Sequence, residues 1–156
     1  PIRQLLNFGG YTEGWATYVE MISYSYAAEG KSDHEAAAIF LAQKQRSMML
    51  GISSLLDIFI HYYGFTRDNI SHFLSEMGIS SKTAANSIYD AALESPANYL
   101  KYYLGYLTFL DLQAYCQQKW PDQFQLSDFH KRVLEIGPCQ FPVLEKYLKL
   151  CYTDAL

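Results

Sequence analysis

The sequence has little of what builds β-structure. Valine occurs only three times in 156 residues, at Val19, Val133 and Val143. No alternating apolar and polar run is bounded by Asn-Gly or Asp-Gly, the pairs that close two-residue hairpins. Because helix signals dominate, we predict an all-α protein of about seven helices packed as an irregular bundle.

Basic charge and long apolar runs are also scarce. Lys and Arg number 12 against 16 Asp and Glu, which gives a formal net charge of -4. No Lys/Arg cluster could neutralise several phosphates, so we expect no nucleic-acid partner. No apolar run reaches the length of about 18 residues that a transmembrane helix needs. We therefore expect a soluble chain without a membrane-spanning segment.

Two further absences concern processing and cysteine chemistry. The sequence opens with Pro1 and shows no basic and apolar leader, so we expect a piece of a longer polypeptide. Cys116, Cys139 and Cys151 form no CxxC pair. We expect them to be small buried hydrophobic residues, with a disulfide or a reactive thiol as the alternative.

The chain does have enough apolar content for one self-supporting core. Half of its residues are hydrophobic and only 18% are charged, so we predict a single helical domain over residues 1–156. Ser32 with Glu35 forms a capping box, Ser95 before Pro96 is a helix start, and Ser127 is a helix cap. Start and stop signals of this kind place the helices at about residues 11–28, 32–61, 66–78, 80–93, 95–119, 127–137 and 142–150.

Tyrosine is the compositional outlier, with 14 copies. Tyr99, Tyr102, Tyr103 and Tyr106 are spaced i, i+3, i+4 and i+7, so one helix face presents all four. This stripe is either part of the core, with its hydroxyls hydrogen-bonded, or the lining of a cleft.

Two carboxylates share a face of the first predicted helix. Glu13 and Glu20 are seven residues apart, and Trp15 lies beside them in an otherwise apolar segment. They are either a solvated stripe, or ligands and hydrogen-bond partners in a buried site.

Asp57 and His61 are four residues apart on the most apolar part of the second predicted helix. This spacing permits a carboxylate–imidazole hydrogen bond, which would fix the tautomer and suit a proton or hydrogen-bond donor. The alternative is a buried pair whose members satisfy each other.

The common catalytic motifs are missing. His34-Glu35 begins like HExxH, but position 38 is Ala, and Glu35 already belongs to a helix start. No two histidines are spaced i, i+4, so the chain alone cannot present the two-histidine helix face of a zinc hydrolase. No GxSxG, P-loop or GxGxxG sequence is present.

Four segments nevertheless match, in order, the hallmarks of one bacterial family. Residues 11–20 are similar to EGWAxYxE, and residues 57–65 are similar to DxxxHxxGW. Residues 96–105 match PxxxxxYxxG, and residues 129–145 fit FHxxxLxxGxxPxxxLE. By these motifs the chain resembles the domain-of-unknown-function family DUF885, whose members resemble gluzincin-type zinc metallopeptidases.

The resemblance implies a division of roles. In the family an HExxPGH helix precedes EGWA and supplies two histidine ligands and a general base, so this chain would be the C-terminal portion of a larger helical catalytic domain. Glu13 would be the third zinc ligand. His61, oriented by Asp57, and Tyr102 would donate hydrogen bonds to the oxyanion. The remaining expected roles are substrate-facing or supporting ones, for Glu20, Trp15 and Tyr103. His130 is expected to be a structural residue at a helix end, with a catalytic role as the alternative.

Some positions depart from the family pattern. Arginines are usual in the family where Leu50, Ser53, Ala91 and Gln113 stand here, and these arginines could hold a substrate carboxylate. Their absence weakens the case for specificity toward a terminal carboxylate. Phe65 replaces the family tryptophan and keeps an aromatic side chain.

Two function classes follow. The leading hypothesis is part of a zinc-dependent, peptidase-like hydrolase that acts on peptide bonds, with zinc in the full-length protein and an inactive fragment. The rival is a catalytically dead helical module that binds peptides or cell-wall material. We also expect that exposed apolar surface could form a homodimer, and the resemblance implies a cell-envelope or extracellular location.

Overall fold

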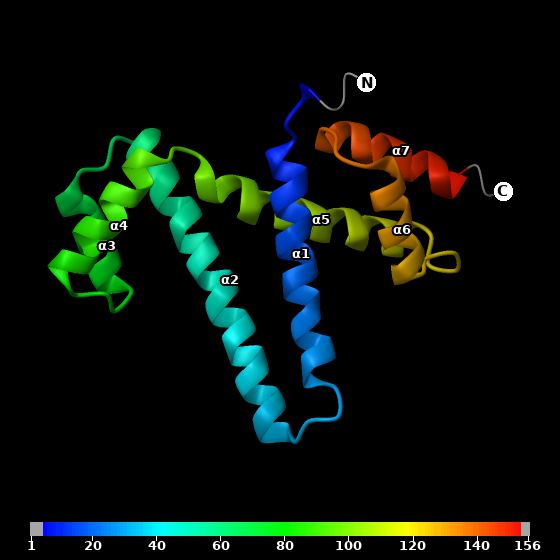
Figure 1. Ribbon diagram of the computed structural model, residues 1–156, viewed down its shortest axis with the longest axis horizontal. Coiled ribbons are helices and arrows are strands. Elements are labelled where there is room, and N and C mark those ends of the chain that lie inside the picture. Colours follow the sequence, from blue (N-terminus) through cyan, green and yellow to red (C-terminus); the bar gives the residue numbers. More distant parts are fainter. Residues whose placement is uncertain (1–4, 154–156) are drawn as a thin grey trace. The chain divides into compact units, whose positions relative to one another are not determined.

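The computed structural model describes residues 5–153, which form α-helices and no strand (Figure 1). The all-α prediction is confirmed. The helices in chain order are α1 (Gly9–Ala28), α2 (Asp33–His61), α3 (Arg67–Glu76), α4 (Lys82–Glu94), α5 (Asn98–Lys119), α6 (Leu126–Ile136) and α7 (Phe141–Thr153). None of the helices in this described part is long and apolar enough to cross a membrane.

The helix ends follow local capping chemistry at some positions and not at others. The capping box is confirmed, because the Glu35 amide donates to Ser32 Oγ and the Ser32 amide donates to Glu35 Oε2 at 3.0 Å. The prediction that Ser95-Pro96 starts a helix is wrong. Ser95 is the C-cap of α4, and Ala97 has a φ of 60°, a left-handed conformation that separates α4 from α5. Ser127 is not a cap either, since α6 begins one residue earlier.

The chain forms two compact units. Unit 1 runs up to Ser23 and resumes at Leu104, and unit 2 runs from Tyr24 to Tyr103. The expectation of one domain for the whole chain stays a prediction, and each unit is described by itself.

Unit 1 is built around an aromatic core. The ring of Phe109 on α5 makes edge contacts with Tyr11 and Trp15 of α1, at 5.3 Å between centroids in each case. Cys116 and Cys139 are buried, as predicted, whereas Cys151 is only partly buried, and these three described cysteines form no disulfide. Burial raises the pKa of the Cys116 thiol to about 11. That thiol is therefore protonated and acts as a small apolar side chain.

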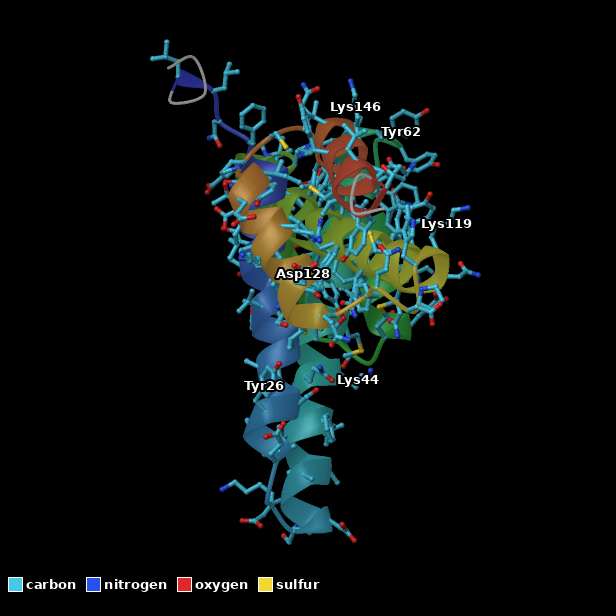
Figure 2. All side chains as sticks on the ribbon, turned by 90° about the vertical axis from the view of Figure 1, so that its right-hand side faces the viewer. Tyr26, Lys44, Tyr62, Lys119, Asp128 and Lys146 are labelled. Atoms are coloured by element: carbon cyan, nitrogen blue, oxygen red, sulfur yellow. The ribbon has the colours of Figure 1, made fainter. Side chains whose placement is uncertain are left out.

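Unit 2 packs α3 and α4 against each other and α4 against α2. Its core comprises Ile52, Leu56, Ile60, Ile70, Leu74, Ala85 and Ala92. Several apolar side chains elsewhere in the unit remain outside it: Leu41 and Met48 are 69% and 56% exposed, and Tyr26 and Tyr62, labelled in Figure 2, are 60% and 80% exposed. The homodimer expected from such surface stays a prediction.

Candidate functional site

Glu13 lies in the first half of α1, where a hydrogen bond and close helix packing fix the position of the backbone. Its side chain is partly buried, and no other side chain among residues 5–153 hydrogen-bonds or ion-pairs with its carboxylate. Thr17, which is 2% exposed, donates its hydroxyl to the Glu13 carbonyl at 2.8 Å. Glu20, one further turn along, is also partly buried. Because both carboxylates are partly buried, the structure argues against a fully solvated stripe.

A close helix crossing fixes the path of α1. A Cβ atom on Gly14 would lie 2.5 Å from the backbone of Gly105 on α5, and a Cβ on Gly105 would lie 2.3 Å from the Gly10 carbonyl oxygen. Only glycine allows this approach, which Figure 1 shows as the crossing of α1 and α5. The glycines of the EGWA and YxxG segments therefore have a packing role beside Glu13.

Tyr18 forms a partly buried polar network that no sequence pattern predicts. Its hydroxyl donates to Gln113 Oε1 at 2.6 Å and lies 3.0 Å from His130 Nε2. Since the single hydroxyl proton goes to Gln113, Nε2 of His130 is the donor in the second bond. Trp15 stacks on Tyr18 and meets the His130 ring edge-on.

His130 is held neutral by this environment. Burial lowers the pKa of its imidazole below the usual value, because desolvation disfavours the charged ring. The prediction of a structural role agrees with this network, although the residue lies within α6 rather than at its end. The FH segment of the sequence was the one available signal for it.

Asp57 and His61 lie together in unit 2 but do not form the direct hydrogen bond that their spacing permits. The distance between Asp57 Oδ1 and His61 Nε2 is 4.0 Å, too long for a hydrogen bond. Nε2 lies 3.2 Å from the Ala92 carbonyl instead. A carbonyl only accepts, so this bond places the proton on Nε2 and leaves Nδ1 without it in the neutral ring.

Asp57 is the more unusual member of this pair. It is 3% exposed, and its Oδ2 has no hydrogen-bond partner among the described residues. A buried carboxylate oxygen without a partner lowers the free energy of unfolding, so packing does not explain why an aspartate stands at this position. The reading of a pair whose members satisfy each other does not fit this oxygen.

The tyrosine stripe on α5 is neither fully buried nor fully exposed. Tyr102 and Tyr103 are both partly buried, and Lys101 Nζ lies 5.4 Å from the centroid of the Tyr102 ring. The Tyr103 ring packs against α2 where Gly51 leaves room, since a Cβ there would lie 3.2 Å from the ring.

The predicted site residues fall into two sets. Glu13, Trp15 and Glu20 belong to unit 1, whereas the other four belong to unit 2. A hollow shared by both sets stays a prediction. Within the described part of the chain, no group of three or more His, Cys, Asp and Glu side chains is close enough together to hold a metal ion.

Comparison with known proteins adds one finding to this geometry. The family model described as "Bacterial protein of unknown function (DUF885)" matches residues 1–148. The chain belongs to the DUF885 family. No curated protein and no solved structure matches it. The family resemblance predicted from the motifs is therefore confirmed, while the family description assigns no activity.

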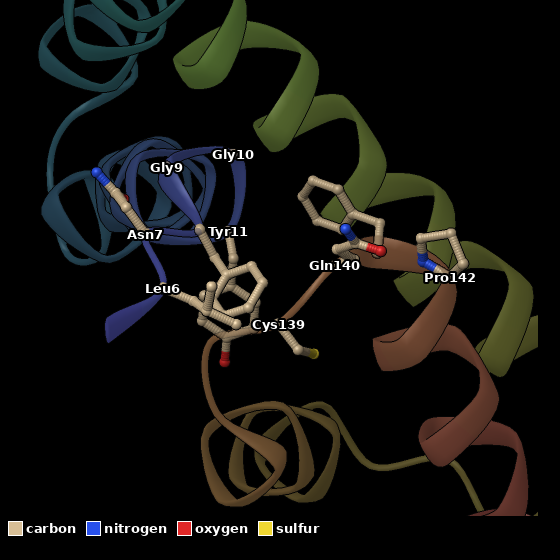
Figure 3. A pocket seen from close by; sticks show the side chains of 10 residues that line it. Leu6, Asn7, Gly9, Gly10, Tyr11, Cys139, Gln140 and Pro142 are labelled. Carbon is tan, nitrogen blue, oxygen red and sulfur yellow. The ribbon is translucent and has the colours of Figure 1, made fainter. Parts of the chain in front are cut away.

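The hollows on this DUF885 chain do not all coincide with the predicted residues. A hollow of about 560 Å³ lies where the segment before α1 meets the start of α7 (Figure 3), and no predicted site residue lines it. A second, of about 470 Å³, is lined by His61 together with Phe65, Arg67 and Tyr89. The Arg67 guanidinium there is paired with Asp90.

The five positions that depart from the expected DUF885 pattern have different surroundings. Leu50 is buried, at 2% exposure. Gln113 accepts the Tyr18 hydroxyl bond. Ser53 and Ala91 line one further hollow in unit 2, so two positions 38 residues apart in the sequence meet at the same place. Phe65 stacks on Phe59, with 4.9 Å between ring centroids.

Proposed function

We propose that this chain is part of a zinc-dependent, peptidase-like hydrolase that cleaves peptide bonds at the cell envelope. In this proposal Glu13 is one zinc ligand, and the two histidine ligands come from a segment of the protein outside this chain. When bound, zinc activates a water molecule and polarises the substrate carbonyl.

The observation that supports the proposal best is the state of Glu13. A carboxylate that is partly buried, unpaired within residues 5–153 and attached to a helix fixed by a glycine crossing is ready to bind a cation. A solvated surface glutamate would need no such anchoring. One carboxylate completes a zinc site but does not make one, so the proposal needs the two histidine ligands from outside this chain.

The other predicted residues have assigned tasks in this proposal. His61 and Tyr102 donate hydrogen bonds to the substrate oxygen as it gains negative charge. Because the Ala92 carbonyl accepts from Nε2 of His61, the nitrogen left for substrate is Nδ1, which donates a hydrogen bond only when both ring nitrogens carry a proton. Asp57 acts on the ring from 4.0 Å as a nearby negative charge. Glu20, Trp15 and Tyr103 contact the substrate or support those that do.

Metal analysis of the full-length protein tests the proposal. We expect about one zinc per wild-type molecule, and at least a tenfold loss of zinc affinity in Glu13→Gln, since a ligand is lost while size and shape are kept. Glu29→Gln, at an exposed glutamate directly after the same helix, is the matched control and should retain its zinc. If Glu13→Gln holds zinc as tightly as the wild type, Glu13 is not a ligand.

A binding module without catalysis is the second candidate. The missing Asp57–His61 hydrogen bond favours it, because an imidazole bound to a backbone carbonyl has a structural use. Full-length protein that contains no zinc yet binds peptides or cell-wall fragments would support this candidate over the hydrolase.

A further inference from the structure

A small apolar pocket lies between α2, α4 and the start of α5 in unit 2. Its volume is about 200 Å³. It exists because Ser53 of α2 faces Ala91 and Ala92 of α4, and these short side chains leave the space between the helices unfilled. The full lining is Met49, Ser53, Leu56, Ile88, Ala91, Ala92 and Tyr99.

The pocket is open at one side and closed at its base. Leu56 and Ala92, at 1% and 8% exposure, form the base, while Met49 and Tyr99 are 42% and 38% exposed at the mouth. A cavity of about 150 Å³ is enough to hold benzene, whereas pockets for whole drug-sized molecules start at about 300 Å³. The size therefore suits one side chain of a larger ligand.

The chemistry of the lining excludes a charged group. Among the described residues, no Asp, Glu, Lys, Arg or His lines the pocket, so a charge placed there would lose its hydration without gaining a partner. Two hydroxyl groups, of Ser53 and Tyr99, make no hydrogen bond with any other residue of the described chain. An apolar lining with a few free polar groups is typical of a ligand pocket, and the hydroxyls can bond to amides beside the apolar group.

We propose that this pocket binds an uncharged apolar side chain of the size of leucine or methionine in a peptide. The identity of the ligand as a peptide rests on the proposed function, whereas the preference for an apolar over a charged group rests on the pocket alone. Met49 at the mouth suits this use, since its unbranched side chain adapts to different apolar groups.

The expected selectivity follows from burial. Complete burial of a leucine side chain favours binding by roughly 10- to 100-fold relative to glycine. A blocked amino acid is a small probe, so we expect dissociation constants in the millimolar range.

The experiment is a titration of the full chain followed through its methionine and alanine methyl signals by NMR. The probes are the N-acetyl amides of leucine, glycine, aspartate and lysine. We expect the leucine probe to shift the methyls of Met49, Ala91 and Ala92 in a saturable way, and the other three to shift them at least tenfold more weakly. Met48 and Met77, exposed outside the pocket, serve as internal controls for non-specific binding.

Two variants locate the binding. In Ala91→Leu the larger side chain fills the pocket from α4 and should abolish saturable binding. In Ser53→Val the larger side chain projects from α2 and should weaken binding. Ala37→Leu, an exposed position of α2 outside the pocket, should bind as the wild type does. Equal shifts with the charged probes, no saturation with leucine, or unchanged binding by a folded Ala91→Leu variant would overturn the assignment. None of these readouts depends on zinc, so a zinc-free protein that still prefers leucine would refute the hydrolase and leave the pocket standing.

Discussion

The α1–α5 crossing gives the sharpest test of the structure. In Gly14→Ala the added Cβ lies 2.5 Å from both the carbonyl carbon and the Cα of Gly105. Carbon atoms pack best at about 3.5–4.0 Å, so the two backbones must separate by about 1 Å. No side-chain rotation can relieve the contact, because both atoms belong to the main chain.

The magnitude follows from that separation. A gap of about 1 Å removes up to half of the dispersion attraction between the facing atoms, and overpacking in a core costs about 1–3 kcal/mol, occasionally more. We expect Gly14→Ala to lower the free energy of unfolding by about 3 kcal/mol or more. Gly10→Ala is the matched control one turn earlier, because its Cβ meets only the Phe141 side chain, at 3.3 Å. Alanine is the better helix former by up to about 1 kcal/mol, so this control should stay within about 1 kcal/mol of the wild type.

Urea unfolding followed by tryptophan fluorescence measures the difference. Both tryptophans, Trp15 and Trp120, lie in unit 1 and report on the part of the chain that contains the crossing. Gly105→Ala should be as damaging as Gly14→Ala, and the double variant should cost less than the sum, because both substitutions break the same contact. Equal urea midpoints for Gly14→Ala and Gly10→Ala would refute the close approach.

Four further predictions use urea unfolding, followed by tryptophan fluorescence for substitutions in unit 1 and by circular dichroism for those in unit 2, which contains no tryptophan. Tyr18→Phe should cost about 1–3 kcal/mol, because Gln113 and His130 both lose a buried partner. His130 has a lowered pKa in the folded chain, so the unfolded chain takes up the proton first as the pH falls. The wild type should therefore lose stability between about pH 7 and pH 5, and His130→Gln should lose less. Ser32→Ala should cost about 1 kcal/mol through loss of the helix cap. Asp57→Asn should raise stability by about 1 kcal/mol or more, because it removes a buried charge with an unpartnered oxygen; a clear destabilisation would contradict that account.

The parts of the fold that the sequence predicted are the local ones. The Ser32 and Glu35 side chains reach each other within one helical turn, so a four-residue pattern decides that helix start. The predicted helix start at Ser95-Pro96 is wrong for a reason that is equally local, but sequence patterns do not reveal it. Ala97 adopts a left-handed φ of 60°. Alanine rarely takes this conformation, so its presence in the sequence does not predict it.

The parts that the sequence could not predict are contacts between distant segments. Tyr18 and His130 are 112 residues apart in the chain, and their hydrogen bond depends on how α1 packs on α6. Periodicity identifies the apolar face on which Tyr18 lies, but it does not name the partner of a buried hydroxyl. The same limit applies to Asp57. Its four-residue spacing to His61 permits a hydrogen bond between the two side chains, but the imidazole bonds to the Ala92 carbonyl instead.

The motif residues separate into two groups according to whether packing accounts for them. Gly14 and Gly105 are explained by the helix crossing, so their presence says nothing about chemistry. Glu13 and Asp57 are different, because neither a partly buried unpaired carboxylate nor a fully buried one with an orphan oxygen improves packing. Residues that cost stability without a structural return concentrate at functional sites. On that reasoning, experiments on activity belong first at Glu13 and Asp57, and changes at the two glycines should be interpreted through the unfolding assay alone.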